Sequence, residues 1–451
     1  MADDPTTIAF RFGYGLPLPE GAVGDAAAML AVLEAPDTII RRHKGVGFAT
    51  ALPLLKDLDE TRRAQKKDPA QKPRYKAAVD ASVNAAIAGA RAGFARALDN
   101  PDGFRERLVR FWANHFSVSA KNRQELLLPG TMIEDAIRPH LTGRFSDMLQ
   151  AATLHPAMLT YLDQVLSVGP TSVVGRRRDR GLNENLAREL IELHTLGVDA
   201  GYSQTDVRQM AELLTGLSVD SLRGFVFDPR RAEPGAETVL GISYSGEGTA
   251  PILQALNDLA MRPETAGHIA RKLVVHFVSD TPDAALVAHL RAAYLKTGGD
   301  LMAVYAALLE HPGASGPGAD KARQPFDFII SSLRALGITG DALMQGGERP
   351  FRRFVIAPMQ GMGQAVQGPG GPDGWPEETA TWINPARLAA RINWAMDVPA
   401  RLLSELPDPT ALAVRALGPR ASERLLWAVA RAESVREGVG LVLASAEFNR
   451  R

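Results

Sequence analysis

The sequence predicts a mainly α-helical protein, an irregular multi-helix bundle with one small β-hairpin or ribbon. Ala, Leu and Arg dominate the chain, and apolar residues recur at helical spacing rather than in alternation. Short β-prone runs, GFVF and TVLGISY, stand out at residues 224–245, on either side of a Pro/Gly turn. We therefore expect these two runs to pair as a two-stranded ribbon within an otherwise helical body.

The predicted helices follow one another along the chain. Their ranges are 26–33, 77–98, 104–116, 132–141, 145–154, 183–194, 204–217, 266–278, 284–295, 301–309, 326–336, 385–396 and 422–448, the last divided near Gly438. The intervening stretches 56–76, 169–181, 311–325 and 361–376 have the composition of linkers, the first heavily charged and the last two rich in Gly and Pro. Long loops of this kind often carry function.

Three helix boundaries have a chemical reason. Asn183 is a good N-cap residue for the 183–194 helix. Ser203, with Asp206 three residues later, is typical of a capping box before the 204–217 helix. His155 precedes Pro156, and because a residue before proline avoids helical backbone, the 145–154 helix is expected to end there.

Composition limits the class of protein. The chain has 451 residues, 51 basic and 51 acidic, so no general attraction to nucleic acid is indicated. It has no cysteine, which excludes disulfides, thiolate nucleophiles and Cys-ligated metals. We predict one helical unit over residues 1–451, with an alternative division into an N-terminal lobe, 1–310, and a C-terminal lobe, 326–451, after a Pro/Gly linker.

The N-terminus shows no basic region followed by an apolar core, so no signal peptide is visible. No apolar run is long enough to cross a membrane. A soluble protein is therefore expected, with cytoplasm and periplasm both left open. No Walker loop, HExxH or GxSxG motif is present, so a site has to be sought among scattered polar residues.

The 183–194 helix has unusual polar density. At about 100° per residue, Asn185, Glu189 and Glu192 share one face and His194 points almost opposite. Glu189, Glu192 and His194 therefore cannot ligate one metal unless the helix breaks before His194. Inward carboxylates bind metal ions or act as general acid and base, and the alternative is an ordinary solvated, Arg-paired face. For His194 we favour a structural position at the helix end, held by the dipole and the last carbonyls.

His115 is the sharper candidate. It continues the apolar stripe of the 104–116 helix, which predicts that its ring points inward. A buried imidazole has to hydrogen-bond or bind something, and a bond to a backbone carbonyl or carboxylate is the alternative to ligand or catalyst. Asn114 lies beside the stripe, where it suits a seam between helices.

Two further histidines are weaker candidates. His155 stands at a break between two apolar helices, where a side chain can face a cavity, and a satisfied residue at a helix junction is the alternative. His276 and Asp280 have the i,i+4 spacing of a His–carboxylate pair. A structural bond is favoured there over a catalytic dyad.

Longer segments resemble the bacterial domain-of-unknown-function 1800 family. They include FWANHFSVS at 111–119, the run from 137 to 163, NENLARELIELHTLGVDAGYSQTDV at 183–207 and KLVVHFVSD at 272–280. The resemblance covers nearly the whole chain. It implies a mostly helical protein, in many members exported and encoded beside a second uncharacterised family, domain of unknown function 1501. It supplies no agreed substrate, cofactor or catalytic residue.

Two hypotheses follow. The first is an enzyme, hydrolytic or oxidative, in which His115, His155, Glu189 and Glu192 converge in a pocket between helices, with or without a divalent metal. The alternative is a non-catalytic scaffold or export partner of a co-encoded protein of the domain-of-unknown-function 1501 family. Unpaired polar residues inside the protein favour the enzyme, whereas an exposed apolar patch over a dry, fully paired interior favours the scaffold.

Overall fold

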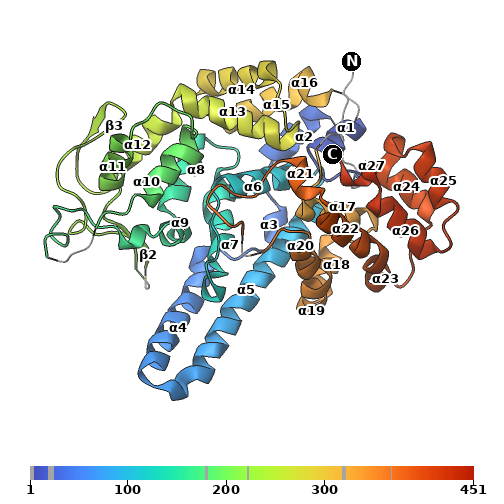
Figure 1. The fold of residues 1–451 in the computed structure, drawn as a ribbon, viewed down its shortest axis with the longest axis horizontal. Coiled ribbons are helices and arrows are strands. Elements are labelled where there is room, and N and C mark those ends of the chain that lie inside the picture. The colour runs from blue at the N-terminus through green and yellow to red at the C-terminus, as the bar shows by residue number, and fades with distance from the viewer. Residues whose placement is uncertain (1–4, 19–24, 178–180, 221–222, 317–320, 367) are drawn as a thin grey trace.

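The computed structural model describes residues 5–18, 25–177, 181–220, 223–316, 321–366 and 368–451. The protein is mainly α-helical, as predicted (Figure 1). Among these residues, two small ribbons are present rather than the one expected. Strand β1 (Leu217–Asp220) pairs with β2 (Gly224–Phe227), and β3 (Glu237–Val239) pairs with β4 (Ile242–Tyr244), both antiparallel. The pairing of GFVF with TVLGISY was therefore wrong, because GFVF pairs with the strand just before it and TVLGISY folds back on itself.

The first two thirds of the chain contain the helices α1 to α16. They are α1 (Pro5–Arg11), α2 (Ala26–Glu34), α3 (Ile39–Arg42), α4 (Phe48–Lys67), α5 (Lys72–Asp99), α6 (Phe104–His115), α7 (Leu128–Met132), α8 (Phe145–Leu154), α9 (Pro156–Tyr161), α10 (Asn185–Glu189), α11 (Gln204–Leu213), α12 (Ala250–Ala260), α13 (Pro263–Phe277), α14 (Ala284–Thr297), α15 (Leu301–Glu310) and α16 (Pro312–Ser315). The predicted capping box is confirmed, since Ser203 and Asp206 exchange hydrogen bonds at the start of α11.

The remaining helices make the C-terminal part. They are α17 (Pro325–Ala335), α18 (Gly340–Gln345), α19 (Glu348–Phe351), α20 (Ala357–Gly361), α21 (Thr379–Trp382), α22 (Pro385–Asp397), α23 (Pro399–Leu402), α24 (Pro409–Leu417), α25 (Glu423–Val429), α26 (Val435–Ala444) and α27 (Ala446–Asn449). The predicted 422–448 helix is thus three helices. Gly438 lies inside α26, and the break comes earlier, where the Ser434 side chain caps that helix.

The charged stretch 56–76 is not a linker. It forms the end of α4 and the start of α5, two long helices that pack side by side and project from the body as an arm (Figure 1). Lys, Arg, Gln and Glu are good helix formers, and on a projecting hairpin their charges stay in water. High charge was therefore misread as loop composition.

Within the described part of the chain, three helical stretches widen into π-helix, at Ile133–Ile137, Leu190–Thr195 and Arg352–Ile356. The predicted 183–194 helix is consequently α10 followed by the π segment Leu190–Thr195. Asn183 acts near its start, where its Oδ1 accepts from the backbone N–H of Asn185 at 2.8 Å. In the π segment the Thr195 hydroxyl donates to the carbonyl of Leu190 at 2.7 Å. Such π-bulges occur frequently at functional sites.

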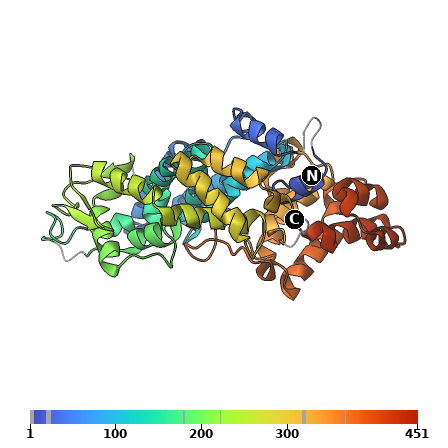
Figure 2. The same cartoon turned by 90° about the horizontal axis from the view of Figure 1, so that it is seen from above.

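Two apolar cores lie along the elongated molecule, which Figure 2 shows from above with green segments at one end and the red C-terminal helices at the other. The first core is built mainly from α6, α8, α9, α12, α13 and α15, and the second from α5, α17, α22, α24 and α26. A buried ion pair joins them, Arg107 of α6 to Asp327 of α17 at 2.6 Å. The division into lobes at 310–326 stays a prediction, and α5, from the N-terminal part, packs in the second core.

Among the described helices, none combines the length and the apolar character that a membrane crossing requires.

Candidate functional site

His115 lies at the C-terminal end of α6, buried among aromatic rings, as its apolar stripe predicted. Its Nε2–H donates to the backbone carbonyl of His194 at 3.1 Å. The other ring nitrogen, Nδ1, has no hydrogen-bond partner within the described residues. Burial, reinforced by Lys272 and the neighbouring histidines, holds the pKa of His115 well below its usual value. The imidazole is therefore neutral and presents one free lone pair.

His194 faces His115 from the π segment, with ring centroids 6.1 Å apart. It is only 1% exposed, yet neither ring nitrogen has a hydrogen-bond partner in the part of the chain that the structure describes. Burial lowers its pKa to about 3. The expectation that the last helical carbonyls hold this ring is wrong. A buried polar group without a partner costs about 1–3 kcal/mol, so its retention calls for an explanation.

A third histidine, His268 of α13, completes the group and was missed in the sequence. Its ring centroid lies 6.1 Å from that of His115, and its Nε2–H donates to the carbonyl of Leu193 at 3.1 Å. Burial lowers its pKa to about 4. We call His115, His194 and His268 the histidine cluster.

Lys272 follows one helical turn after His268. It is half-buried, and burial lowers its pKa to about 8 against the opposing influence of Glu377 and Asp373. His268, Lys272 and His276 repeat at i, i+4 and i+8 along α13. This polar stripe on one side of an apolar helix is the sequence signal that could have revealed the site.

Glu189 and Glu192 do not join the histidine cluster, although they precede His194 on the same helical stretch. Glu192 accepts from Arg188 at 3.2 Å, one helical turn earlier. Burial and the neighbouring Glu192 raise the pKa of Glu189, and Asp373 of the Pro/Gly loop adds to the effect. The two carboxylates thus form a half-buried acidic pair on the helical stretch that leads to His194.

His155 belongs to a different place. Its Nδ1 accepts from the backbone N–H of Ala157 at 3.1 Å and so caps α9, while Nε2 lies 3.6 Å from Asp135. Among the described residues, no hydrogen bond, ion pair or ring contact joins His155 to His115. The structure therefore does not bring these two histidines together, and it gives His155 a role at a helix junction.

Asn114 anchors the Pro/Gly loop against α6. Its Nδ2 donates to the carbonyl of Trp375 at 3.0 Å, and its Oδ1 accepts from the N–H of the same residue at 2.6 Å. The loop turns here through Gly374, whose φ is +87°. A Cβ on Gly374 would come within 2.6 Å of the Asn114 carbonyl, so only glycine fits.

His276 does not pair with Asp280. Its Nδ1–H donates to Glu377 of the same loop at 2.7 Å, while Arg107 donates to Nε2 at 3.3 Å. Asp280 lies beyond the end of α13 and accepts from Lys321 at 2.7 Å. The i,i+4 pairing failed because α13 ends at Phe277, before the carboxylate. The loop thus supplies a buried carboxylate that the sequence did not identify.

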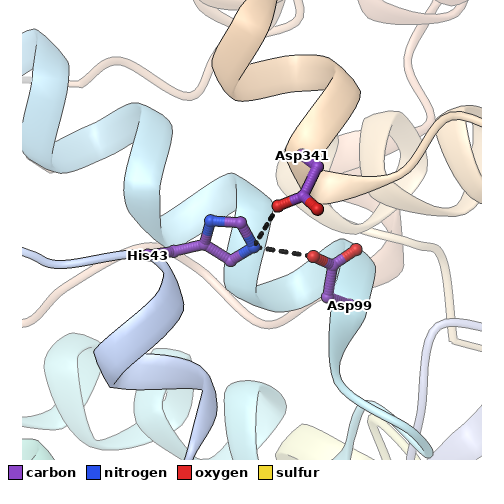
Figure 3. A group of neighbouring side chains, drawn as sticks. All are labelled: His43, Asp99 and Asp341. Carbon is purple, nitrogen blue, oxygen red and sulfur yellow. Dashed lines mark hydrogen bonds and ion pairs between the residues drawn. The ribbon is translucent and has the colours of Figure 1, made fainter.

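His43, Asp99 and Asp341 form the one described group of three whose ligand atoms all lie within 4.8 Å, the spacing of a cation site (Figure 3). His43 Nε2 lies 2.6 Å from Asp99 and 3.8 Å from Asp341. The carboxylates are already used: Arg42 pairs with both, and the Gly340 N–H donates to Asp99 at 2.7 Å. We therefore assign this group to holding α3, α5 and α18 together.

The fold and the site define a large, mainly α-helical protein with a buried, neutral histidine cluster where α6, α13 and a π segment meet. The model of a family described as a protein of unknown function, DUF1800, matches residues 10–450. The chain belongs to this family, which confirms the resemblance seen in its motifs. No curated protein and no solved structure matches it.

Proposed function

We propose that this protein is a metal-dependent enzyme, hydrolytic or oxidative, whose catalytic centre is the histidine cluster. The observation that carries the proposal is the state of His194, which is fully buried and has neither ring nitrogen bonded among the described residues. A group of this kind is retained at a cost to stability when it serves a ligand.

We favour a metal ion as that ligand. The ring nitrogens of the three histidines do not all lie within 4.8 Å of one another, a spacing that the described residues reach only at His43, Asp99 and Asp341, so the ion would have to draw the rings together. A ligating histidine is neutral, and its second nitrogen commonly donates to a carbonyl or carboxylate. His115 and His268 have this arrangement, since their Nε2–H groups donate to the adjacent carbonyls of His194 and Leu193. Imidazole ligands suit zinc, iron and copper. Such an ion would activate a bound water or polarise a substrate carbonyl.

Residues beside the cluster supply proton transfer. Lys272, with a pKa of about 8, exchanges a proton near neutral pH. Asp373 lies near both Lys272 and Glu189, whose pKa burial raises. We therefore give Glu189, one of the two carboxylates identified in the sequence, a role in proton transfer. His155 is left outside the site.

Metal binding tests the proposal directly. We expect the purified chain, titrated with Zn²⁺, Fe²⁺ or Cu²⁺ by calorimetry with elemental analysis, to bind a single ion. His194→Ala and His115→Ala should abolish uptake while leaving the circular dichroism spectrum unchanged. His43→Ala is the matched control, because this histidine is equally buried but lies in another part of the protein, where its Nε2 pairs with Asp99 at 2.6 Å, and it should keep the ion. Zinc would indicate hydrolytic chemistry and iron or copper oxidative chemistry.

Two outcomes would contradict the enzyme hypothesis. One is the absence of ion binding by the unaltered chain, and the other is equal binding by the His194→Ala variant. The hypothesis of an export partner for the co-encoded protein would then take its place. At present the interior argues against it, because buried Tyr14, Glu106 and His194 atoms lack partners within the described residues, whereas a scaffold is expected to be fully paired.

A further inference from the structure

A cavity of about 180 Å³ lies on the other side of α6 from the histidine cluster, between α5, α6, α7 and α17. The loop that holds Gly368, Pro369 and Trp375 forms one of its walls. For comparison, an engineered apolar cavity of about 150 Å³ takes up benzene. The space is therefore large enough for an organic molecule.

Small residues on α5 keep the cavity open. Ala86, Gly89, Ala90 and Gly93 line it at i, i+3, i+4 and i+7, so they share one face of the helix. A Cβ at Gly93 would meet no heavy atom within 4 Å, and the same is true of Gly130 on α7. Glycine inside a helix costs about 0.5–1 kcal/mol relative to alanine, so the open space is kept at some expense of stability.

The end of the cavity formed by α5 and α7 is mostly apolar, and the charged Arg96 and Glu134 that also line it pair with each other at 2.8 Å. Its lining there includes Val46, Leu126, Leu127, Met132 and Ile133. An apolar wall of this kind favours a hydrocarbon body over water.

The end formed by α6 and α17 carries donors that lack an acceptor. Arg110 lies over the ring of Phe326, 4.5 Å from its centroid, and has no hydrogen bond or ion pair among the described residues. The hydroxyl of Tyr14 also lines the cavity, is buried and has no partner there. Of the nearby carboxylates, Asp327 accepts from Arg107 at 2.6 Å and Glu106 Oε2 accepts from Arg138 at 2.7 Å, whereas Glu106 Oε1 has no partner among the described residues. Arg110 thus makes no ion pair with either carboxylate.

We propose that this cavity binds an amphiphilic carboxylate, with the hydrocarbon body along α5 and α7 and the carboxylate on Arg110 and Tyr14. A guanidinium and a phenolic hydroxyl are both donors, and a carboxylate accepts from both at once. Because the site is partly desolvated, the charged contact is stronger than it would be in water. None of the residues of the histidine cluster lines this cavity, so carboxylate binding here does not depend on the proposed metal chemistry.

Calorimetry with octanoate as the probe tests this site in the full chain, treated with a chelator to remove metal. The unaltered protein should bind octanoate at least about tenfold more tightly than octan-1-ol or octylamine, the loss expected when a charged hydrogen bond is removed. Equal binding of octanoate and octan-1-ol, or no binding of octanoate, would overturn the proposal without any variant being needed.

Two variants with matched controls locate the ligand. Arg110→Gln should weaken octanoate binding about tenfold or more, whereas Arg431→Gln should not, although Arg431 also lies over an aromatic ring, that of Trp427. Gly93→Leu should abolish binding by filling the cavity, and Gly361→Leu, at an exposed helical glycine with equal free space, should leave it unchanged. Binding that survives both Arg110→Gln and Gly93→Leu would place the ligand elsewhere and refute the assignment.

Discussion

Replacing His194 by leucine should make the metal-free protein more stable. The substitution removes two ring nitrogens that are buried without hydrogen-bond partners in the described chain. It also keeps the side-chain volume similar, so packing changes little. An unsatisfied buried polar group costs about 1–3 kcal/mol, and this amount should be recovered at pH 8.

The stability that the His194→Leu substitution adds should increase as the pH falls. The pKa of His194 is about 3 in the folded protein, against about 6.5 in an unfolded chain. Between these values the unfolded state binds more protons than the folded one, so the unaltered protein loses stability as pH falls through this window. At pH 5 the loss from this residue amounts to about 2 kcal/mol, and the leucine variant escapes it. Its advantage should therefore reach about 3–5 kcal/mol at that pH.

Urea unfolding with a chelator at pH 8 and pH 5 measures both effects. His43→Leu is the matched comparison, because His43 is equally buried but is bonded to Asp99 at 2.6 Å. It should lose about 1–3 kcal/mol, since the carboxylate is left without this partner. If His194→Leu were as destabilising as His43→Leu at both pH values, the idea that His194 is kept for a ligand would be refuted.

Two further substitutions test the contacts that hold α6 to α17 and to the loop around Trp375. Asp327→Asn should cost about 3–5 kcal/mol in urea unfolding, because Arg107 is left as an uncompensated buried charge; a cost below about 1 kcal/mol would contradict this. Asn114→Ala removes both hydrogen bonds to Trp375, so amide hydrogen exchange in residues 368–377 should accelerate while α6 keeps its protection. Unchanged exchange in that loop would show that other contacts hold it.

Features that depend on a single helix could be predicted from the spacing of residues along the sequence. His115 continues a stripe of large apolar residues, and its inward direction followed from 3.6 residues per turn and is observed. Likewise, the capping box before α11 needs only neighbouring residues, and it formed as expected.

What was missed depends on contacts between distant segments or on a change of helix type. The widening at Leu190–Thr195 leaves no pattern in the residues, so the angle between Glu189 and His194 could not be derived from a regular helix. Glu377 reaches His276 from a loop about a hundred residues later in the chain, a pairing that local spacing does not encode. The i,i+4 partner, Asp280, was the nearer but mistaken choice.

The π segment Leu190–Thr195 makes the site sensitive to the loss of a single residue. Its carbonyls at Leu193 and His194 are the acceptors that orient the other two histidines, so the backbone there serves as their common reference. Deleting one residue from the turn would let it relax to ordinary α-helix and would move the carbonyls of Leu193 and His194 from their present positions. All three imidazoles would then lose their mutual orientation in one step, whereas a side-chain substitution disturbs only one of them. The geometry of the histidine cluster therefore depends as much on the number of residues in this turn as on their identity.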